Sequence, residues 1–243
     1  FITGPRVLKS VTGREISLDK LGGAYVHSHK SGVAHFVHST EEETLHAIRE
    51  LIDYLPSDSS NEPPIVETKD IPHRKCPKLD GIIPADPKET YDMKKILVEI
   101  VDRESFFEVQ ADWAANLVTA FAKLNGYTIG LVANQSITLA GALDIDASDK
   151  ASRFIRFCDA FNIPIVTFVD VPGFLPGVDQ EHNGIIRHGA KILYAYAEAT
   201  VPKISVITRK AYGGAYICMS SKDLGGDRNY AWPTARIAVL GAE

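Results

Sequence analysis

The stretch ASRFIRFCDAFNIPIVTFVD, residues 151–170, joins a helical pattern directly to a strand pattern. Its first half carries Phe154, Phe157, Cys158 and Phe161 at the three- and four-residue spacing of one apolar helix face. Its second half, NIPIVTFVD, is a short apolar run with β-branched residues, which predicts a buried strand. A helix that leads straight into a buried strand is typical of an α/β domain.

The same alternation extends in both directions along the chain. Downstream we expect a helix over residues 185–199, a strand over 203–208 and another helix beginning at 213. Upstream we expect a helix over 108–124 and a strand over 127–134. The helix over 185–199 should bury Ile186, Ala190, Leu193 and Ala197. The pattern predicts an α/β fold with largely parallel strands.

The first part of the chain carries one further helix signal. Residues 39–55, STEEETLHAIRELIDYL, offer Thr40 as a cap and glutamates for the first turn. One apolar stripe follows, with Leu45, Ile48, Leu51 and Ile52. The next stretch, roughly residues 56–90, concentrates Pro, Ser, Asp and charge with little periodicity. We expect a linker or a domain boundary there.

Composition limits the class of protein. The chain has 243 residues, of which 45% are hydrophobic, enough for a sizeable core. No apolar run approaches the ~20 residues of a spanning helix, so we expect a soluble protein without a membrane span. A net charge of -5 with interspersed signs argues against nucleic-acid binding. Scattered cysteines without a CxxC pair suggest a reducing compartment, and the partners should be small molecules or proteins.

Two turns are the places to expect a ligand, because ligands of α/β sheets collect beyond the carboxyl ends of strands. DVPGFLPG, residues 170–177, and KAYGGAY, residues 210–216, each follow a predicted strand. In the second turn, Gly213, Gly214 and Ala215 leave bare backbone at a helix start. The first N–H groups of a helix lack intrahelical partners and could stabilise an oxyanion. Ordinary turn chemistry is the more common explanation of such a glycine pair.

Other catalytic motifs give little support. The glycines fit neither GxxxxGK[ST] nor GxGxxG, and the chain has no GxSxG elbow and no HExxH. A histidine-rich run contains His27, His29, His35 and His38. Their spacing matches no zinc signature and no Cys or acidic ligand lies among them, so we expect no metal. For His188 we expect a polar contact on its helix, with a catalytic role as the alternative.

Several long motifs together give a stronger signal than any single one. In chain order they include FITGPRVLKSVTG, LGGAYVHSHKSGVAH, YDMKKILVEIVDRESFFEVQ, RFIRFCDAFNIPIVTFVDVPGFLPG, GIIRHGAKILYAYAEATVPK, ITRKAYGGAY and NYAWPTA. Over nearly the whole chain, in order and spacing, these motifs resemble the carboxyltransferase (β) subunit of biotin-dependent acyl-CoA carboxylases of the propionyl-CoA carboxylase type.

The resemblance implies an α/β crotonase-like ββα spiral in two similar domains. By that comparison, residues 1–57 are the C-terminal tail of an N-terminal carboxyltransferase domain, 58–90 are a linker and 91–243 are most of the C-terminal carboxyltransferase domain. Most of the acyl-CoA site would then lie outside this chain. A start without Met or a signal peptide agrees with a segment taken from a longer subunit. The implied location is the cytoplasm or, in a eukaryote, the mitochondrial matrix.

The resemblance also implies an activity and an assembly. A homo-hexamer would work beside a biotin carboxylase and a biotin carboxyl carrier subunit, and would transfer CO2 from carboxybiotin to the α carbon of propionyl-CoA or acetyl-CoA. One alternative is a biotin-dependent decarboxylase or transcarboxylase subunit, which would transfer the carboxyl group from acyl-CoA to biotin. The decarboxylase would act beside a membrane sodium-pump subunit. An alternative of another class is a non-catalytic assembly fragment.

Residue roles follow from the matched motifs. The N–H groups of Gly214 and Ala215 would form the oxyanion hole for the ureido oxygen of biotin, with Gly213 and Tyr216 beside them in the biotin-binding segment. The facing wall would come from DVPGFLPG, with Gly173 and Phe174 as the candidates.

Three positions depart from the family pattern. Ile217 stands where propionyl-CoA carboxylases often have Asp, at a position that shapes the acyl pocket, so the acyl preference stays open. Arg236 replaces a frequent Glu, and Asn183 replaces a frequent Gly. We interpret these last two as local variation.

Overall fold

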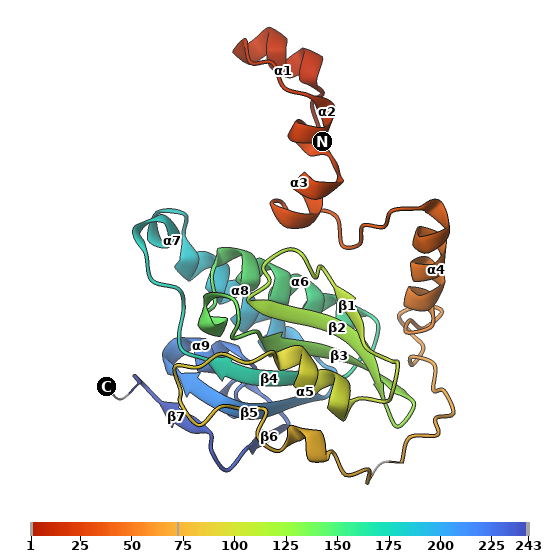
Figure 1. The fold of residues 1–243 in the computed structure, drawn as a ribbon, viewed down its shortest axis with the longest axis vertical. Coiled ribbons are helices and arrows are strands. Elements are labelled where there is room, and N and C mark those ends of the chain that lie inside the picture. Colours follow the sequence, from red (N-terminus) through yellow and green to blue (C-terminus); the bar gives the residue numbers. More distant parts are fainter. Residues whose placement is uncertain (1, 72, 242–243) are drawn as a thin grey trace.

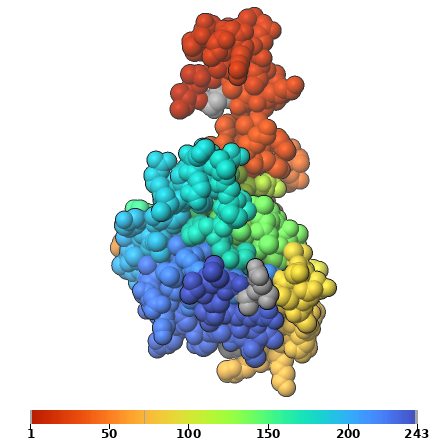
Figure 2. Space-filling model, turned by 90° about the vertical axis from the view of Figure 1, so that its left-hand side faces the viewer, coloured from red at the N-terminus to blue at the C-terminus, as the bar shows by residue number. Residues whose placement is uncertain are grey.

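The computed structural model describes residues 2–71 and 73–241 and contains an α/β domain with an extended N-terminal arm (Figure 1). The arm carries α1 (Pro5–Thr12), α2 (Leu18–Gly22) and α3 (Ala24–His29), followed by α4 (Glu41–Ile52). Helices α1 to α3, shown in red in Figure 2, project from one end of the domain. Helix α4 lies at the side of the domain.

The domain begins after an irregular stretch. Its helices are α5 (Met93–Ile100), α6 (Ile145–Ala160), α7 (Val178–His182), α8 (Ile185–Glu198) and α9 (Gly213–Cys218), and its strands are β1 (Phe107–Val109), β2 (Leu117–Leu124), β3 (Tyr127–Asn134), β4 (Ile165–Val171), β5 (Lys203–Tyr212), β6 (Arg228–Ala231) and β7 (Arg236–Ala238). Short 3-10 turns occupy Pro77–Leu79, Leu139–Gly141 and Lys222–Leu224. Every helix and strand predicted after residue 125 is confirmed, with shifts of a few residues at the ends.

The strands form one mixed sheet. Its order is β1-β2-β3-β4-β5-β6, and β7 also pairs with β5. The pairs from β3 to β7 are parallel, as predicted, whereas β1, β2 and β3 are antiparallel neighbours. Helices α6 and α8 cover one face of the sheet and α5 covers the other (Figure 1). The central strands are therefore buried on both sides, which explains their nearly continuous apolar sequences.

The predicted helix over 108–124 is wrong, because this segment forms β1 and β2. Leu117 and Phe121 face the α6 side, and Val118 faces the α5 side. A spacing of four residues suits one face of a strand as well as one face of a helix. The deciding signal is the Asn125–Gly126 pair, whose φ angles of 51° and 81° give a tight β2–β3 hairpin.

The face of α8 that packs inward also differs from the prediction. The buried residues are Ile185, Gly189, Ile192, Ala195 and Tyr196, whereas Ile186 is 83% exposed. Adjacent apolar pairs such as Ile185–Ile186 fit two helix phases equally well. The Tyr196 hydroxyl, fully buried, contacts the Thr167 hydroxyl at 2.7 Å on β4, and this contact fixes the phase. On α6 the predicted apolar face is confirmed, with Phe154 and Cys158 buried.

Helix α4 forms as predicted, and its cap is confirmed. The Thr40 hydroxyl accepts a hydrogen bond from the Glu43 N–H at 3.1 Å, and the Glu43 carboxylate accepts from the Ser39 N–H. Of the apolar stripe, only Leu51 packs against the core, and the other three residues are exposed.

The stretch between α4 and α5 contains no helix or strand among its described residues apart from the 3-10 turn Pro77–Leu79. It is tied to the domain by the Val66 N–H, which donates to the Gly126 carbonyl, and by Arg74, which donates to the Glu99 and Val101 carbonyls. The domain boundaries placed around it stay a prediction.

A buried lysine holds the connection between β1 and β2. The Lys150 ammonium on α6 is fully buried and donates to the carbonyl oxygens of Gln110, Trp113 and Leu117 at 2.7–2.8 Å. Burial lowers the pKa of Lys150 to about 7, while the ring of carbonyl oxygens favours the protonated form. The ammonium adds to the backbone hydrogen bonds of this connection, in which the Trp113 N–H donates to the Gln110 carbonyl and the Leu117 N–H donates to the Ala114 carbonyl.

Replacing Lys150 by Met should lower the free energy of unfolding by roughly 2 to 4 kcal/mol, because several buried carbonyls would lose their donor at nearly constant side-chain volume. Urea-induced unfolding measures the change. The matched control is Lys222→Met at an exposed position, which should stay within about 0.5 kcal/mol of the parent protein. Equal stabilities of the two variants would contradict the structural role of Lys150.

Candidate functional site

A buried ion pair ties together the carboxyl ends of three strands. Arg209 on β5 donates from Nη2 to the Asp170 carboxylate on β4 at 2.9 Å, and both side chains are buried. The other Asp170 oxygen accepts from the Lys210 N–H at 3.0 Å. The Asp170 N–H donates to the Asn134 side chain, at the end of β3, at 3.2 Å. The turns that leave β4 and β5 therefore start from fixed positions.

The turn after β4 contacts the segment before α6 and one glycine of α8. The φ angles of Gly173 and Gly177 are 152° and 156°, a region that glycine tolerates. Leu143 and Phe174 form a bridge in which the Leu143 N–H donates to the Gly173 carbonyl and the Leu175 N–H donates to the Leu143 carbonyl. The bridge gives this proline- and glycine-rich turn a defined path.

The ring of Phe174 rests on a glycine of α8. A Cβ atom at Gly189 would lie 2.7 and 2.8 Å from two ring carbons of Phe174, closer than side chains pack. Gly189 is thus required for the close approach of the turn to α8.

The turn after β5 leads directly into α9. Gly213 has a φ of 59° and lies beside the Val239 carbonyl, whereas Gly214 has an ordinary helical φ and open space where a side chain would be. No side chain caps this helix, and Ala215 is buried behind Gly214. Within residues 2–71 and 73–241, the N–H groups of Gly214 and Ala215 donate to no carbonyl of a turn or helix cap. They are donors at the positive end of a short helix.

The two turns meet at one pocket of about 420 Å³. Three of the predicted site residues line it: Phe174, Gly214 and Ile217. Gly173, Gly213, Ala215 and Tyr216 are neighbours of these residues in the chain but do not line the pocket. The rest of the wall is mostly apolar and comes from α8, with Ile185, Ile186, Gly189 and Leu193. Ile186, Ala190 and Leu193 were grouped on one apolar face from the sequence, but this face lines the pocket and is not packed against the sheet as predicted.

The side chains at the pocket offer little acid–base chemistry. Burial raises the pKa of the Cys218 thiol to about 11, so it stays protonated at neutral pH. Burial and Asp223 raise the pKa of Tyr216. The charged residue in the pocket wall is Glu181 of α7, and apart from Cys218 the other lining residues are glycines or have apolar side chains. Such a site suits stabilisation of negative charge better than proton transfer by a side chain.

The histidines take part in local contacts. His188 makes the expected polar contact, with its Nδ1 at 3.0 Å from both oxygens of Asp149, which also pairs with Lys191. His27 and His29 each contact a serine at 2.8 Å. Over residues 2–71 and 73–241, no three His, Cys, Asp or Glu side chains are grouped closely enough to hold a metal ion.

Within the same ranges, no helix has the length and apolar character needed to cross a membrane.

Comparison with known proteins gives the family. The family model of the carboxyl transferase domain matches residues 1–243. The chain belongs to the carboxyl transferase family. It is 60% identical over 243 residues to the propionyl-CoA carboxylase, carboxyltransferase subunit, of Haloferax mediterranei, covering 100% of this chain and 47% of that protein. It is 57% identical over 241 residues to the methylmalonyl-CoA decarboxylase subunit alpha of Veillonella parvula, covering 99% of this chain and 47% of that protein.

A solved structure with high sequence identity has the same fold. Transcarboxylase 12S, described as a hexamer with methylmalonyl-coenzyme A and methylmalonic acid bound, matches with a TM-score of 0.96 and 52% identity over 99% of this chain and 46% of that chain. This match and the mixed sheet confirm the crotonase-like α/β fold. The chain spans about half the length of the relatives that it matches.

The two adjacent glycines should respond differently to substitution. Gly213→Ala should lower the free energy of unfolding by about 1 kcal/mol or more, because Gly213 has a positive φ and a Cβ would lie 3.1 Å from the Val239 carbonyl. Gly214→Ala should leave the free energy of unfolding unchanged or raise it slightly, since Gly214 has a helical backbone and a Cβ atom there would meet no other atom. Urea-induced unfolding of both variants tests the contrast, and equal losses would refute it.

Proposed function

We propose that this chain supplies the biotin-side part of a carboxyltransferase that transfers CO2 from carboxybiotin to the α carbon of a short-chain acyl-CoA, propionyl-CoA or acetyl-CoA. The observation that carries the proposal is the convergence of Phe174, Gly214 and Ile217 from two separate turns on one pocket. Family membership supports the reaction class, and the relative from Haloferax mediterranei is named as a propionyl-CoA carboxylase subunit.

The residues present fit biotin. Gly214 is exposed and has open space before it, so a flat ring system can approach the backbone without meeting a side chain. Around that space the pocket is lined mainly by apolar side chains, including Phe174 and Ile217. A mostly apolar wall with a few backbone donors is the usual composition of a cofactor site.

The role of this chain is to stabilise charge and to exclude water. When bound, carboxybiotin supplies the carboxyl group, and negative charge gathers on its ureido oxygen as that group leaves. The N–H groups of Gly214 and Ala215 would donate to this oxygen. Loss of one such donor typically costs about 3 to 4 kcal/mol of barrier. Phe174 and Ile217 would keep water from the donors, which strengthens their interaction with the charge.

The neighbouring backbone would hold these donors in place. Gly213 sets the turn that starts α9, and Tyr216 lies one residue beyond Ala215. Gly173 lets the facing turn bring Phe174 onto α8.

The partners follow from the same proposal. Biotin would arrive on a biotin carboxyl carrier subunit after being carboxylated by a biotin carboxylase. A homo-hexamer is supported by the transcarboxylase 12S match, whose description names a hexamer assembly. The remainder of the acyl-CoA site would belong to parts of the subunit outside this chain, since its relatives are about twice as long.

One observation favours a second candidate, transfer in the opposite direction. The relative from Veillonella parvula, at 57% identity, is named methylmalonyl-CoA decarboxylase subunit alpha. Backbone donors for a ureido oxygen would serve both directions, because the same charge develops in each. The two directions are distinguished by initial rates. The rate of carboxyl transfer from carboxybiotin to propionyl-CoA is compared with the rate of transfer from methylmalonyl-CoA to biotin.

Replacing Gly214 by Val should reduce carboxyl transfer by about 100-fold or more, because a branched side chain would fill the space in front of the two N–H donors. The measurement is incorporation of labelled bicarbonate into acyl-CoA by the enzyme assembled with its biotin carboxylase and carrier.

Folding and assembly are the controls for this variant. Its unfolding midpoint and its size-exclusion profile should match those of the parent protein. Near-normal transfer by Gly214→Val would show that the donors are assigned wrongly. A parent protein that transfers carboxyl groups in neither direction would instead support a non-catalytic assembly role.

Ile217 should influence acyl choice, since it is 44% exposed at the edge of the pocket. Ile217→Asp should change the ratio of kcat/KM for propionyl-CoA to that for acetyl-CoA by about tenfold in favour of propionyl-CoA, a typical effect of one pocket residue. The control Ile237→Asp introduces the same charge on β7, outside the pocket wall, and should leave the ratio unchanged. Equal ratios for both variants would place the acyl group elsewhere.

A further inference from the structure

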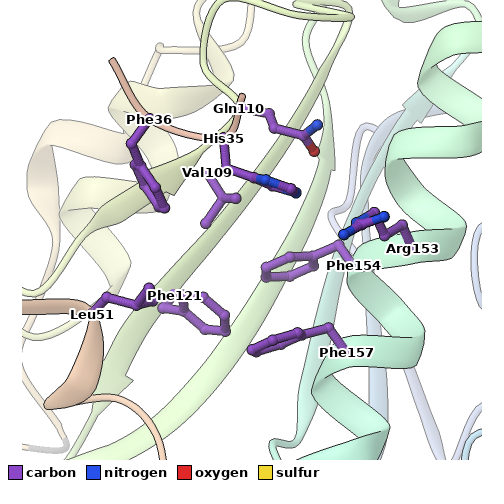
Figure 3. A pocket seen from close by; sticks show the side chains of 9 residues that line it. All are labelled: His35, Phe36, Leu51, Val109, Gln110, Phe121, Arg153, Phe154 and Phe157. Carbon is purple, nitrogen blue, oxygen red and sulfur yellow. The ribbon is translucent and has the colours of Figure 1, made fainter. Parts of the chain in front are cut away.

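A second pocket, separate from the biotin-side pocket, lies between the N-terminal arm and the sheet (Figure 3). It has a volume of about 340 Å³ and shares no lining residue with the first pocket. Residues 35–36 and α4 close it on one side, and β1, β2 and α6 form the other. Its volume is within the usual range for small-molecule sites, roughly 300 to 1,000 Å³.

Most of the pocket wall is apolar and rigid. It consists of Phe36, Leu51, Val109, Phe121, Phe154 and Phe157. The Phe121 ring packs against Phe154 and Phe157, with centroid distances of 5.1 and 5.8 Å. These rings belong to the main core cluster or pack against it, so the wall is held in place by the fold itself.

The polar groups of the pocket gather at one end. Figure 3 shows His35, Gln110 and Arg153 on the side of the pocket away from Phe121 and Phe157. Gln110 fixes the arm here, because its N–H donates to the His35 carbonyl at 3.1 Å and its side chain donates to the Gly32 carbonyl at 2.6 Å. His35 is thereby held at the edge of the pocket next to Arg153.

The guanidinium of Arg153 has no hydrogen bond or ion pair within residues 2–71 and 73–241. One turn later on α6, Arg156 pairs with Glu198 at 3.6 Å. The acids beyond His35 are already engaged, since Glu108 pairs with Lys94 at 2.6 Å and Asp112 lies 4.0 Å from His29. Burial and the charge of Arg153 lower the pKa of His35, so His35 is neutral at neutral pH. This end of the pocket carries one positive charge without a counterion.

We propose that this pocket binds a small organic acid with an apolar body. Its carboxylate would pair with Arg153 and accept a hydrogen bond from His35, and its body would lie against Phe121, Phe154 and Phe157. A guanidinium matches a carboxylate with two parallel hydrogen bonds, and burial of the body against aromatic rings adds affinity.

Other classes of ligand match the pocket less well. Inorganic phosphate would satisfy Arg153 but would leave the aromatic wall facing water. A neutral hydrocarbon would fill the aromatic part but would leave the guanidinium without an anion. A carboxylate joined to an aryl or short alkyl group complements both ends. The inference is independent of the proposed carboxyl transfer, because it involves none of the residues assigned to that reaction.

Isothermal titration calorimetry of the purified protein with hydrocinnamate tests the proposal, and hydrocinnamyl alcohol is the matched ligand without charge. Hydrocinnamate should bind saturably with a Kd of about 1 mM or tighter, and the alcohol should bind at least tenfold more weakly. Arg153→Gln should weaken hydrocinnamate binding at least tenfold, whereas Arg156→Gln on the same helix should not change it.

The variants are exposed substitutions, and equal thermal unfolding midpoints would show that they fold alike. The proposal is overturned if the parent protein does not bind hydrocinnamate, if acid and alcohol bind equally, or if Arg153→Gln and Arg156→Gln have the same effect. Phe157→Ala tests the apolar end of the pocket, and it should weaken the binding of both hydrocinnamate and hydrocinnamyl alcohol.

Discussion

The ion pair between Asp170 and Arg209 fixes the arrangement on which the candidate site depends. Removing two charges from water costs several kcal/mol, so a buried pair persists where further hydrogen bonds satisfy it. Here the Lys210 N–H donates to Asp170, and Arg209 donates to the Glu89 carbonyl and stacks on the Tyr91 ring. The pair sits beside the irregularity between Val169 and Val171 in the β4–β5 register. Its main effect is to specify where β4 and β5 end.

Glycine and aromatic side chains complete the site beyond that point. The turn after β4 reaches α8 because Gly189 has no side chain where the Phe174 ring lies. The turn after β5 can expose N–H groups because Gly213 takes a positive φ and Gly214 leaves space in front of them. Three glycines, each needed for a different physical reason, thus shape one pocket. The pocket depends on backbone geometry more than on reactive side chains.

The sequence predicted the second half of the domain well because its patterns are long and each fits one period. Helix α6 and strand β4 are separated only by a short turn that contains Asn162, with a φ of 56°, and Pro164, and both elements were located correctly. The segment that forms β1 and β2 could not be assigned from spacing alone, since Leu117 and Phe121 fit two periods. The Asn125–Gly126 turn contained the missing information. For the site, the two turns and the apolar face of α8 with Ile186 and Leu193 were predicted from the sequence. That this face lines a pocket and is not part of the core depends on the long-range packing of Tyr196 against β4.

The carbonyl ring around Lys150 has a consequence for the arm as well as for the sheet. Backbone carbonyl oxygens that converge on one point can also coordinate a free monovalent cation. Here the cation is covalently part of α6, and the same loop presents Gln110 to the arm. The docking of residues 32–36 is therefore coupled to the position of α6, and the carbonyl oxygens of the loop are paired with a cation that needs no supply from the surroundings.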